Sequence, residues 1–123
     1  VHYRRHNGRP YRYAYLAETR TDGVLPTHLV KVDVADGGAV RGEWTAPACR
    51  PGEAVFVPAP DPDAEDDGVL VSLVLDEGSE ESFLLVLAAT TMDELARARL
   101  PHATPFPFHG QFYAATDPVR SMQ

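Results

Sequence analysis

The sequence predicts an all-β fold built from antiparallel strands, and three observations lead to this expectation. Apolar residues recur with a period of two in several segments, including residues 11–15 (Tyr-Arg-Tyr-Ala-Tyr), as in strands with one buried face. Two runs at 69–75 and 82–87 are almost continuously apolar, which indicates strands buried on both faces. Glycine, aspartate and proline separate the runs and favour turns between strands.

A first group of strands is predicted at residues 11–15, 29–34 and 39–44. Valine and leucine dominate the second of these segments, and β-branched side chains fit a pleated sheet. The sequence Asp-Gly-Gly at 36–38 separates the second segment from the third. Because Asp-Gly readily adopts the positive φ angles of a tight turn, we expect residues 29–44 to form a β-hairpin.

A second group is predicted at residues 55–57, 69–75, 82–87 and 96–100. The first of these segments ends at a proline, and the last is followed by one. Residues 76–81, which include a glycine, are the expected turn between the two long apolar runs.

Three connecting segments complete the expected organisation. The acidic run at 61–67 contains a proline and precedes a glycine, which is typical of a solvated loop. Residues 91–95 are predicted to form one helical turn with Thr91 as its cap. Residues 105–113 are expected to be a last extended segment.

This count of strands suits a β-propeller. The second group has four strands, the first group has most of another set, and the segment at His109 opens a third. Four-stranded antiparallel units that follow one another every 40–50 residues or so are the signature of propeller blades. A β-sandwich uses the same kinds of strand, so periodicity alone leaves both architectures open.

Composition excludes several classes of function. The chain has 123 residues, of which 44 % are hydrophobic and 24 % charged, as in globular proteins. Its net charge of −7 argues against a nucleic-acid partner. The single cysteine, Cys49, cannot form an internal disulfide, which favours a reducing cytoplasm. No apolar run approaches the roughly 20 residues of a membrane-spanning helix.

Histidines are the residues most suited to a metal site. The sequence has neither a zinc-finger spacing nor a phosphate-binding glycine loop, and the acidic run lacks the ligand pattern of a calcium loop. His109 differs from the other histidines because Phe106, Phe108 and Phe112 flank it and Gly110 follows it. An apolar setting suits a metal ligand, but on these local grounds a buried histidine held by one hydrogen bond is the favoured interpretation.

Blade geometry gives His109 a candidate partner. The first strand of each propeller blade lies next to the central channel, and Glu53 precedes one such strand while His109 opens the next. Their separation of 109 − 53 = 56 residues is close to one blade with a long loop. Metal-bound histidines usually donate their second N–H to a carboxylate, which Glu53 can supply. The alternative for Glu53 is a surface acid on the turn formed by Pro51 and Gly52.

Five short segments occur in an order that matches a known family. Their sequences are GRPYRYAY at 8–15, GEAVFVP at 52–58, EDDGVL at 65–70, LARA at 95–98 followed by LP at 100–101, and PFPFHG at 105–110. Together they resemble motifs of the carotenoid cleavage oxygenases, which include the retinal pigment epithelium isomerase and stilbene-cleaving relatives. Ala54 stands where the family usually has proline.

The resemblance implies a seven-bladed β-propeller with non-haem Fe(II) (Fe²⁺) on its axis. The family holds this iron with four histidines and no carboxylate ligand, and His109 matches the last of the four. Glu53 matches a glutamate that hydrogen-bonds a ligand histidine, and Phe108 matches an aromatic residue near the substrate tunnel. The implied reaction is the O2-dependent cleavage of a conjugated C=C bond in a carotenoid or apocarotenoid, which gives two carbonyl products.

The same resemblance implies that the site is incomplete here. The family's domain is several times longer than this chain, so residues 1–123 are expected to be the C-terminal part of the propeller, without the upstream blades. His2, His6, His28 and His102 match none of the ligand positions. The isolated chain is therefore expected to be inactive. The full-length protein is expected to be cytoplasmic, with peripheral membrane contact allowed. A non-enzymatic all-β binding or scaffold module without metal is the alternative.

Overall fold

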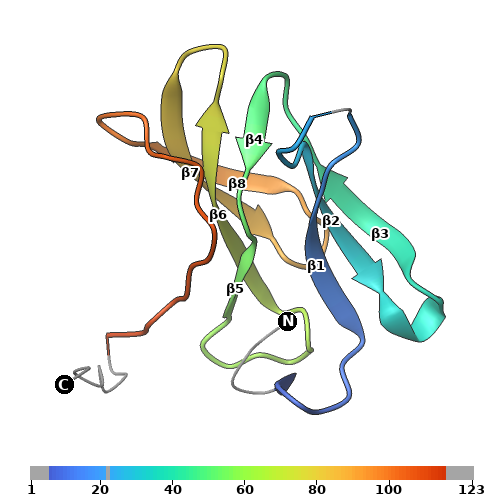
Figure 1. The fold of residues 1–123 in the computed structure, drawn as a ribbon. Helices are drawn as coiled ribbons and strands as arrows, with labels where there is room; N and C mark the ends of the chain where they lie inside the picture. The colour runs from blue at the N-terminus through green and yellow to red at the C-terminus, as the bar shows by residue number, and fades with distance from the viewer. Residues whose placement is uncertain (1–5, 22, 116–123) are drawn as a thin grey trace.

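A computed structural model describes residues 6–21 and 23–115, which form two antiparallel sheets (Figure 1). The first sheet has three strands in the order β1-β2-β3. Its strands are β1 (Tyr13–Glu18), β2 (His28–Asp33) and β3 (Ala39–Trp44). His2 lies outside the described residues.

The second sheet has five strands, of which β4, β6, β7 and β8 lie in that order, and β5 pairs with β6 beyond the end of β4. Its strands are β4 (Cys49–Pro51), β5 (Val55–Pro58), β6 (Gly68–Asp76), β7 (Glu81–Ala88) and β8 (Glu94–Arg99). The two groups of strands predicted from the apolar pattern are therefore confirmed, with β4 as an addition.

The predicted hairpin between residues 29 and 44 is also confirmed. Strands β2 and β3 pair antiparallel and are joined by a short 3-10 turn, η1 (Val34–Asp36), that ends at two glycines. Gly37 and Gly38 have φ angles of 61° and 83°, which glycine adopts without steric cost.

One local prediction is wrong. Residues 91–95 do not form a helical turn, because β7 and β8 are paired as far as Leu87 and Glu94 and the connection must reverse the chain in a few residues. The Thr91 hydroxyl accepts the Asp93 N–H within this turn rather than capping a helix. Residues 105–113, expected to be a last extended segment, lie alongside the second sheet and are not paired with it as a strand.

The core lies between the two sheets. Leu29 and Trp44 of the first sheet pack against buried leucine, valine and phenylalanine side chains of β6 and β7. The Tyr15 ring stacks on Phe56 with ring centroids 5.9 Å apart, and its hydroxyl donates to the Ala89 carbonyl. Burial raises the pKa of Tyr15 because the charged phenolate is disfavoured in an apolar setting. These contacts dock the inner face of the first sheet onto the second.

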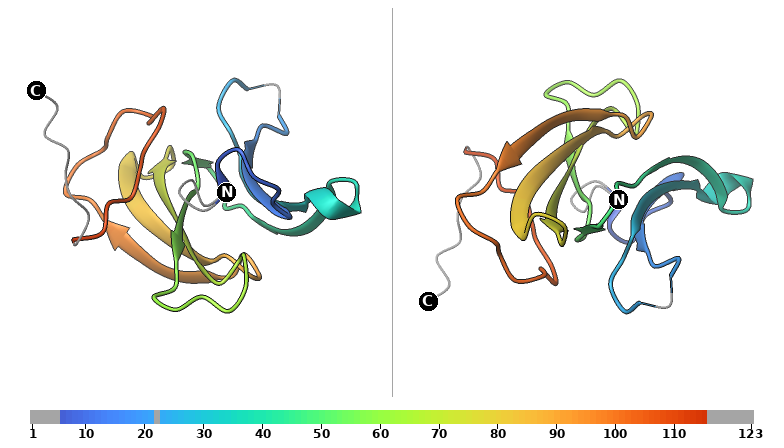
Figure 2. Two further views of the ribbon diagram at one scale, coloured as in Figure 1. Left: turned by 90° about the horizontal axis from the view of Figure 1, so that it is seen from below. Right: turned by 90° about the horizontal axis from the view of Figure 1, so that it is seen from above.

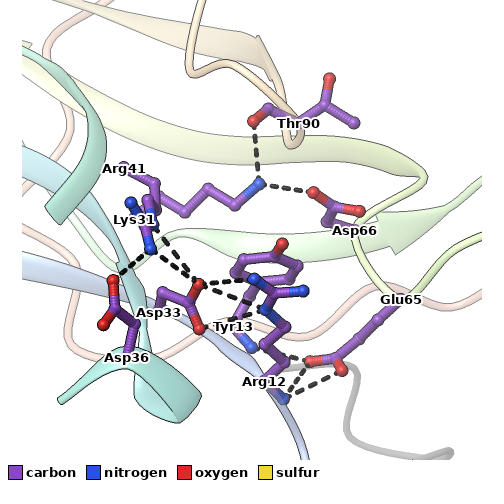
Figure 3. A network of polar contacts seen from close by, with 9 residues as sticks. All are labelled: Arg12, Tyr13, Lys31, Asp33, Asp36, Arg41, Glu65, Asp66 and Thr90. Carbon is purple, nitrogen blue, oxygen red and sulfur yellow. Dashed lines mark hydrogen bonds and ion pairs between the residues drawn. The ribbon is translucent and has the colours of Figure 1, made fainter. Parts of the chain in front are cut away.

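A buried lysine joins the two sheets (Figure 3). Lys31 on β2 is 2 % exposed, and its Nζ lies 2.5 Å from Asp66 Oδ2 and 2.8 Å from the Thr90 carbonyl. The ammonium also lies 4.1 Å from the centroid of the Tyr13 ring, an attractive cation–π distance. A buried charge is tolerated only when it is paired and hydrogen-bonded. Lys31 therefore requires the loop that carries Asp66 and the turn that carries Thr90 to be in place.

The acidic loop is more than the solvated segment that the sequence predicts. Both oxygens of the Glu65 carboxylate lie 2.9 Å from the Arg12 amide nitrogen, and Oε1 also accepts the Tyr13 N–H at 2.9 Å. The loop itself and the exposure of Asp61 and Asp63 are as expected. Glu65 and Asp66 differ from these exposed acids because each has a donor. The start of β1 donates backbone N–H groups to Glu65, and the buried Lys31 donates to Asp66.

The C-terminal segment covers the opposite face of the second sheet (Figure 2). Thr104 begins this contact by donating its N–H to the Ser82 hydroxyl at 2.9 Å. The chain then crosses the face that carries Val71, Leu73 and Leu84, which points away from the core. No helix among residues 6–21 and 23–115 is long and apolar enough to span a bilayer.

Replacing Asp66 by alanine tests the buried pair. Removing one partner of a buried ion pair leaves an uncompensated charge, so we expect the free energy of unfolding to fall by about 3–5 kcal/mol. The measurement is urea denaturation at neutral pH. Asp63→Ala, in the same loop but exposed, is the matched control and should change the value by less than about 0.5 kcal/mol. Equal effects of the two variants would contradict the role given to Lys31.

Replacing Asp33 by asparagine tests an acid dependence. Hydrogen bonding from Arg12, with a further contribution from Arg41, lowers the pKa of the buried Asp33 carboxyl. A depressed folded-state pKa stabilises the fold above the unfolded pKa of about 4, and this stability is lost as the pH falls through the folded value. Stability of the wild type should therefore decline more steeply below about pH 4 than stability of Asp33→Asn. Thermal unfolding at a series of pH values measures both slopes, with exposed Asp61→Asn as the control that keeps the wild-type slope.

Candidate metal-ligand site

The candidate site begins with a bulge in the edge strand of the second sheet. Strand β4 ends with Pro51 opposite Val74, and β5 begins with Val55 opposite Val71. Three residues, 52–54, therefore face two residues, 72 and 73, of β6. This one extra residue makes a β-bulge, a feature that bends a strand and redirects a side chain.

The bulge decides which face receives Glu53. Strict alternation from Pro51, which is fully buried, would place Glu53 on the core face and Phe56 on the opposite one. The extra residue reverses this phase, because a shift of one residue moves every side chain to the other face. Phe56 consequently packs on the core, and the Glu53 carboxylate faces the C-terminal segment.

His109 lies on that segment and meets Glu53. The Nδ1 atom of His109 is 3.3 Å from Glu53 Oε2, and the Gly110 N–H donates to the same oxygen at 3.2 Å. The two side chains are 84 % and 48 % exposed. The structure thus brings together the two residues that the sequence pairs, and it does not place His109 in the core.

The contact leaves Nε2 of His109 for another partner. When Nδ1 carries the proton and donates it to the carboxylate, Nε2 keeps its lone pair, which is the tautomer that a metal ligand needs. The donor set therefore fits one imidazole ligand of a metal. In the part of the chain that the structure describes, no three histidine, cysteine or acidic side chains gather as a metal site would require.

An apolar groove of about 280 Å³ adjoins the pair. It runs between the C-terminal segment and the outward face of the second sheet. Phe108 lines it, is 88 % exposed, and has its ring centroid 6.1 Å from that of His109. The side chains that line the groove come from Glu53, Val55, Val71, Leu73, Leu84 and residues 107–112.

The other described histidines lie elsewhere. His6 contacts the Pro10 carbonyl, His28 contacts the Thr27 hydroxyl, and His102 lies in an exposed bend after β8. Cys49 is buried, and burial raises the pKa of its thiol, which makes the reactive thiolate rarer.

Sequence reasoning missed the bulge and most of the groove. A three-residue strand such as β4 is too short for a periodic pattern. The structure buries both Pro51 and Phe56 on the core side, five positions apart, which a regular strand cannot do. Because proline is usually exposed, the sequence alone carried no signal for this bulge.

A family model described as "Retinal pigment epithelial membrane protein" matches residues 1–114. Among curated proteins, the torulene dioxygenase of Fusarium fujikuroi is 45 % identical over 105 residues, which are 85 % of this chain and 18 % of that protein. The β,β-carotene 15,15′-dioxygenase of Rattus norvegicus is 39 % identical over 108 residues, or 87 % of this chain and 19 % of that protein. The chain spans about a fifth of the length of these curated relatives.

Solved structures agree with the fold. An ACO/RPE65 chimera superposes with a TM-score of 0.76 at 34 % identity, over 85 % of this chain and 22 % of that one. Cobalt-substituted Synechocystis ACO gives a TM-score of 0.75 at 34 % identity, over 83 % of this chain and 22 % of that one. These neighbours are propellers, so the prediction of propeller blades is confirmed over that of a β-sandwich.

Proposed function

The chain belongs to the carotenoid cleavage oxygenase family, also described as the retinal pigment epithelial membrane protein family, and from this membership we propose that it is part of a non-haem Fe(II) dioxygenase. Its substrate is a carotenoid or apocarotenoid, and its second substrate is O2. Residues 1–123 are the C-terminal part of the propeller domain, and the remaining ligands of the iron come from blades outside this chain.

One observation carries the proposal: His109, in the segment PFPFHG, has Nδ1 against the Glu53 carboxylate, and among residues 6–21 and 23–115 no partner is recorded for Nε2. His109 is the residue that would hold the iron, through Nε2. Glu53 would fix the tautomer and the ring orientation of His109. Because neutral imidazoles do not compensate the charge of a metal ion, the carboxylate would also offset part of that charge.

When bound through His109 and ligands from other blades, Fe(II) would supply the activation of O2. The C=C bond breaks and each of its carbons gains one oxygen atom, so both atoms of O2 enter the two carbonyl products. The four electrons lost at the two carbons reduce O2, and the reaction needs no separate reductant.

The groove suits an apolar chain next to the iron position. Phe108 and the aliphatic side chains of the outward sheet face line it, and such walls bind extended hydrocarbon and exclude water. Phe108 would contact the substrate close to His109.

A cytoplasmic location with peripheral membrane contact of the full-length protein is part of the same proposal.

A chimera tests the ligand role. We would replace the matching segment of the Synechocystis apocarotenoid oxygenase with this chain, at 34 % identity, and measure iron content and apocarotenoid cleavage. His109→Ala should abolish stoichiometric iron and cleavage, because one ligand is lost. Glu53→Gln should lower iron affinity or activity by about 10–100-fold, the usual effect of removing the carboxylate behind a ligand histidine.

His102→Ala is the matched control in that chimera, since His102 lies in an exposed bend, and it should leave both values unchanged. A folded His109→Ala chimera that retains full iron content would refute the ligand role. It would favour the alternative of a binding or scaffold module without metal.

The isolated chain should be inactive. A single histidine cannot hold Fe(II) tightly, because the affinity of such sites comes from several ligands together. The test adds Fe(II) and an apocarotenoid to the chain under air and follows the polyene absorbance and the carbonyl products. Loss of absorbance should not exceed that with Fe(II) alone; cleavage at an enzyme-like rate would show that the chain carries a complete site.

A further inference from the structure

The bulge at residues 52–54 is held by a hydroxyl that the proposed reaction does not use. Ser72 lies on the core face of β6, between Leu70 and Val74, and is 2 % exposed. Its hydroxyl donates to the Gly52 carbonyl at 3.0 Å. A polar side chain in an apolar core costs free energy unless it is hydrogen-bonded, so this serine is suited to one partner, and that partner is the backbone of the bulge.

Gly52 joins the bulge to the segment that carries His109. Its N–H donates to the Leu73 carbonyl at 2.9 Å, which ties the bulge to β6 from the other side. A Cβ at this position would lie 2.7 Å from Pro107 Cγ and 3.1 Å from the Leu73 carbonyl oxygen. The absence of a side chain therefore lets Pro107 rest directly on the bulge.

Both contacts act on the distance between Glu53 and His109. Glu53 follows Gly52 directly, and His109 is two residues beyond Pro107. The ladder on either side is regular, so the bulge is the place where the carboxylate could swing away or the strand could slip. A slip of one residue would turn Glu53 toward the core face and remove it from His109.

We propose that Ser72 and Gly52 are positioning residues for the Glu53–His109 pair: the Ser72 hydroxyl fixes the bulge that presents the carboxylate, and Gly52 admits the proline that brings the imidazole to it. This inference rests on the proposed function, because it explains how the chain prepares His109 as a ligand. Neither residue lines the groove beside His109, and neither is proposed to contact iron or substrate.

The test reads the tautomer of His109 by ¹⁵N NMR on the whole chain, without metal and at alkaline pH, where imidazoles are neutral. In the wild type, Nδ1 should resonate as the protonated nitrogen and Nε2 as the unprotonated one. In Ser72→Ala and in Gly52→Ala, the two resonances should move toward each other as the Nδ1–H form loses its partner. The shift in Ser72→Ala tests the role of Ser72, and the shift in Gly52→Ala tests the role of Gly52.

Leu85→Val is the matched control. Leu85 lies directly opposite Ser72 on β7 and is fully buried, so its truncation weakens the same part of the core without touching the bulge. This variant should keep the wild-type resonances. A merely structural role for Ser72 predicts instead that Leu85→Val shifts them as far as Ser72→Ala does, which would overturn the proposal.

Two further results separate this inference from the proposed function. Unchanged resonances in folded Ser72→Ala and Gly52→Ala would overturn the positioning role and leave the ligand role of His109 standing. If the wild type itself lacks the Nδ1–H form, the Glu53–His109 contact is wrong, and the positioning role fails with it. Iron content of the chimera then decides the ligand role on its own.

Discussion

The buried ammonium of Lys31 is the constraint on which the arrangement of the two sheets depends. It comes from the first sheet, but both of its oxygen partners, Asp66 and the Thr90 carbonyl, belong to the second. A shift of one sheet against the other that kept Lys31 buried would leave its charge desolvated and without these partners, so the contact fixes how the sheets are placed against each other. The loop that carries Asp66 connects β5 to β6, so the same contact fixes the far end of the strand that follows the bulge.

The bulge at residues 52–54 places Glu53 of the second sheet at the candidate metal-ligand site. A regular edge strand would bury Glu53 and expose Phe56, which suits neither residue. The one extra residue of the bulge places both side chains suitably. Phe56 reaches Tyr15 in the core, and the Glu53 carboxylate reaches His109 in the groove. The requirements of the core and of the site are therefore met by the same local irregularity, and this is a frequent use of bulges next to functional sites.

The apolar pattern was enough to predict the strands, their grouping and the hairpin at Gly37 and Gly38, because burial has a period that a sequence displays. The pairing of Glu53 with His109 was predictable only from blade spacing and the order of motifs. The partners of Glu65 and Asp66 were not predictable: an acidic run looks the same whether it is solvated or bound, and what distinguishes it here are backbone N–H groups and a lysine far away in the chain. The helical turn at Thr91 failed because strand pairing outweighed a local capping preference.

The exposure of His109 indicates that its contact with Glu53 does not hold the fold together. A hydrogen bond between side chains that are 84 % and 48 % exposed contributes little free energy, at most about 1 kcal/mol, so it cannot serve to hold the sheets together. Its effect would be on orientation, since under the proposed function it would favour one tautomer and one ring direction of His109 before a metal binds. Affinity would then come from combining several such prepared histidines on different blades. In that arrangement a blade would contribute the placement of one nitrogen atom, and the stability that supports this placement comes from buried contacts such as those of Lys31 and Ser72, which do not involve the imidazole itself.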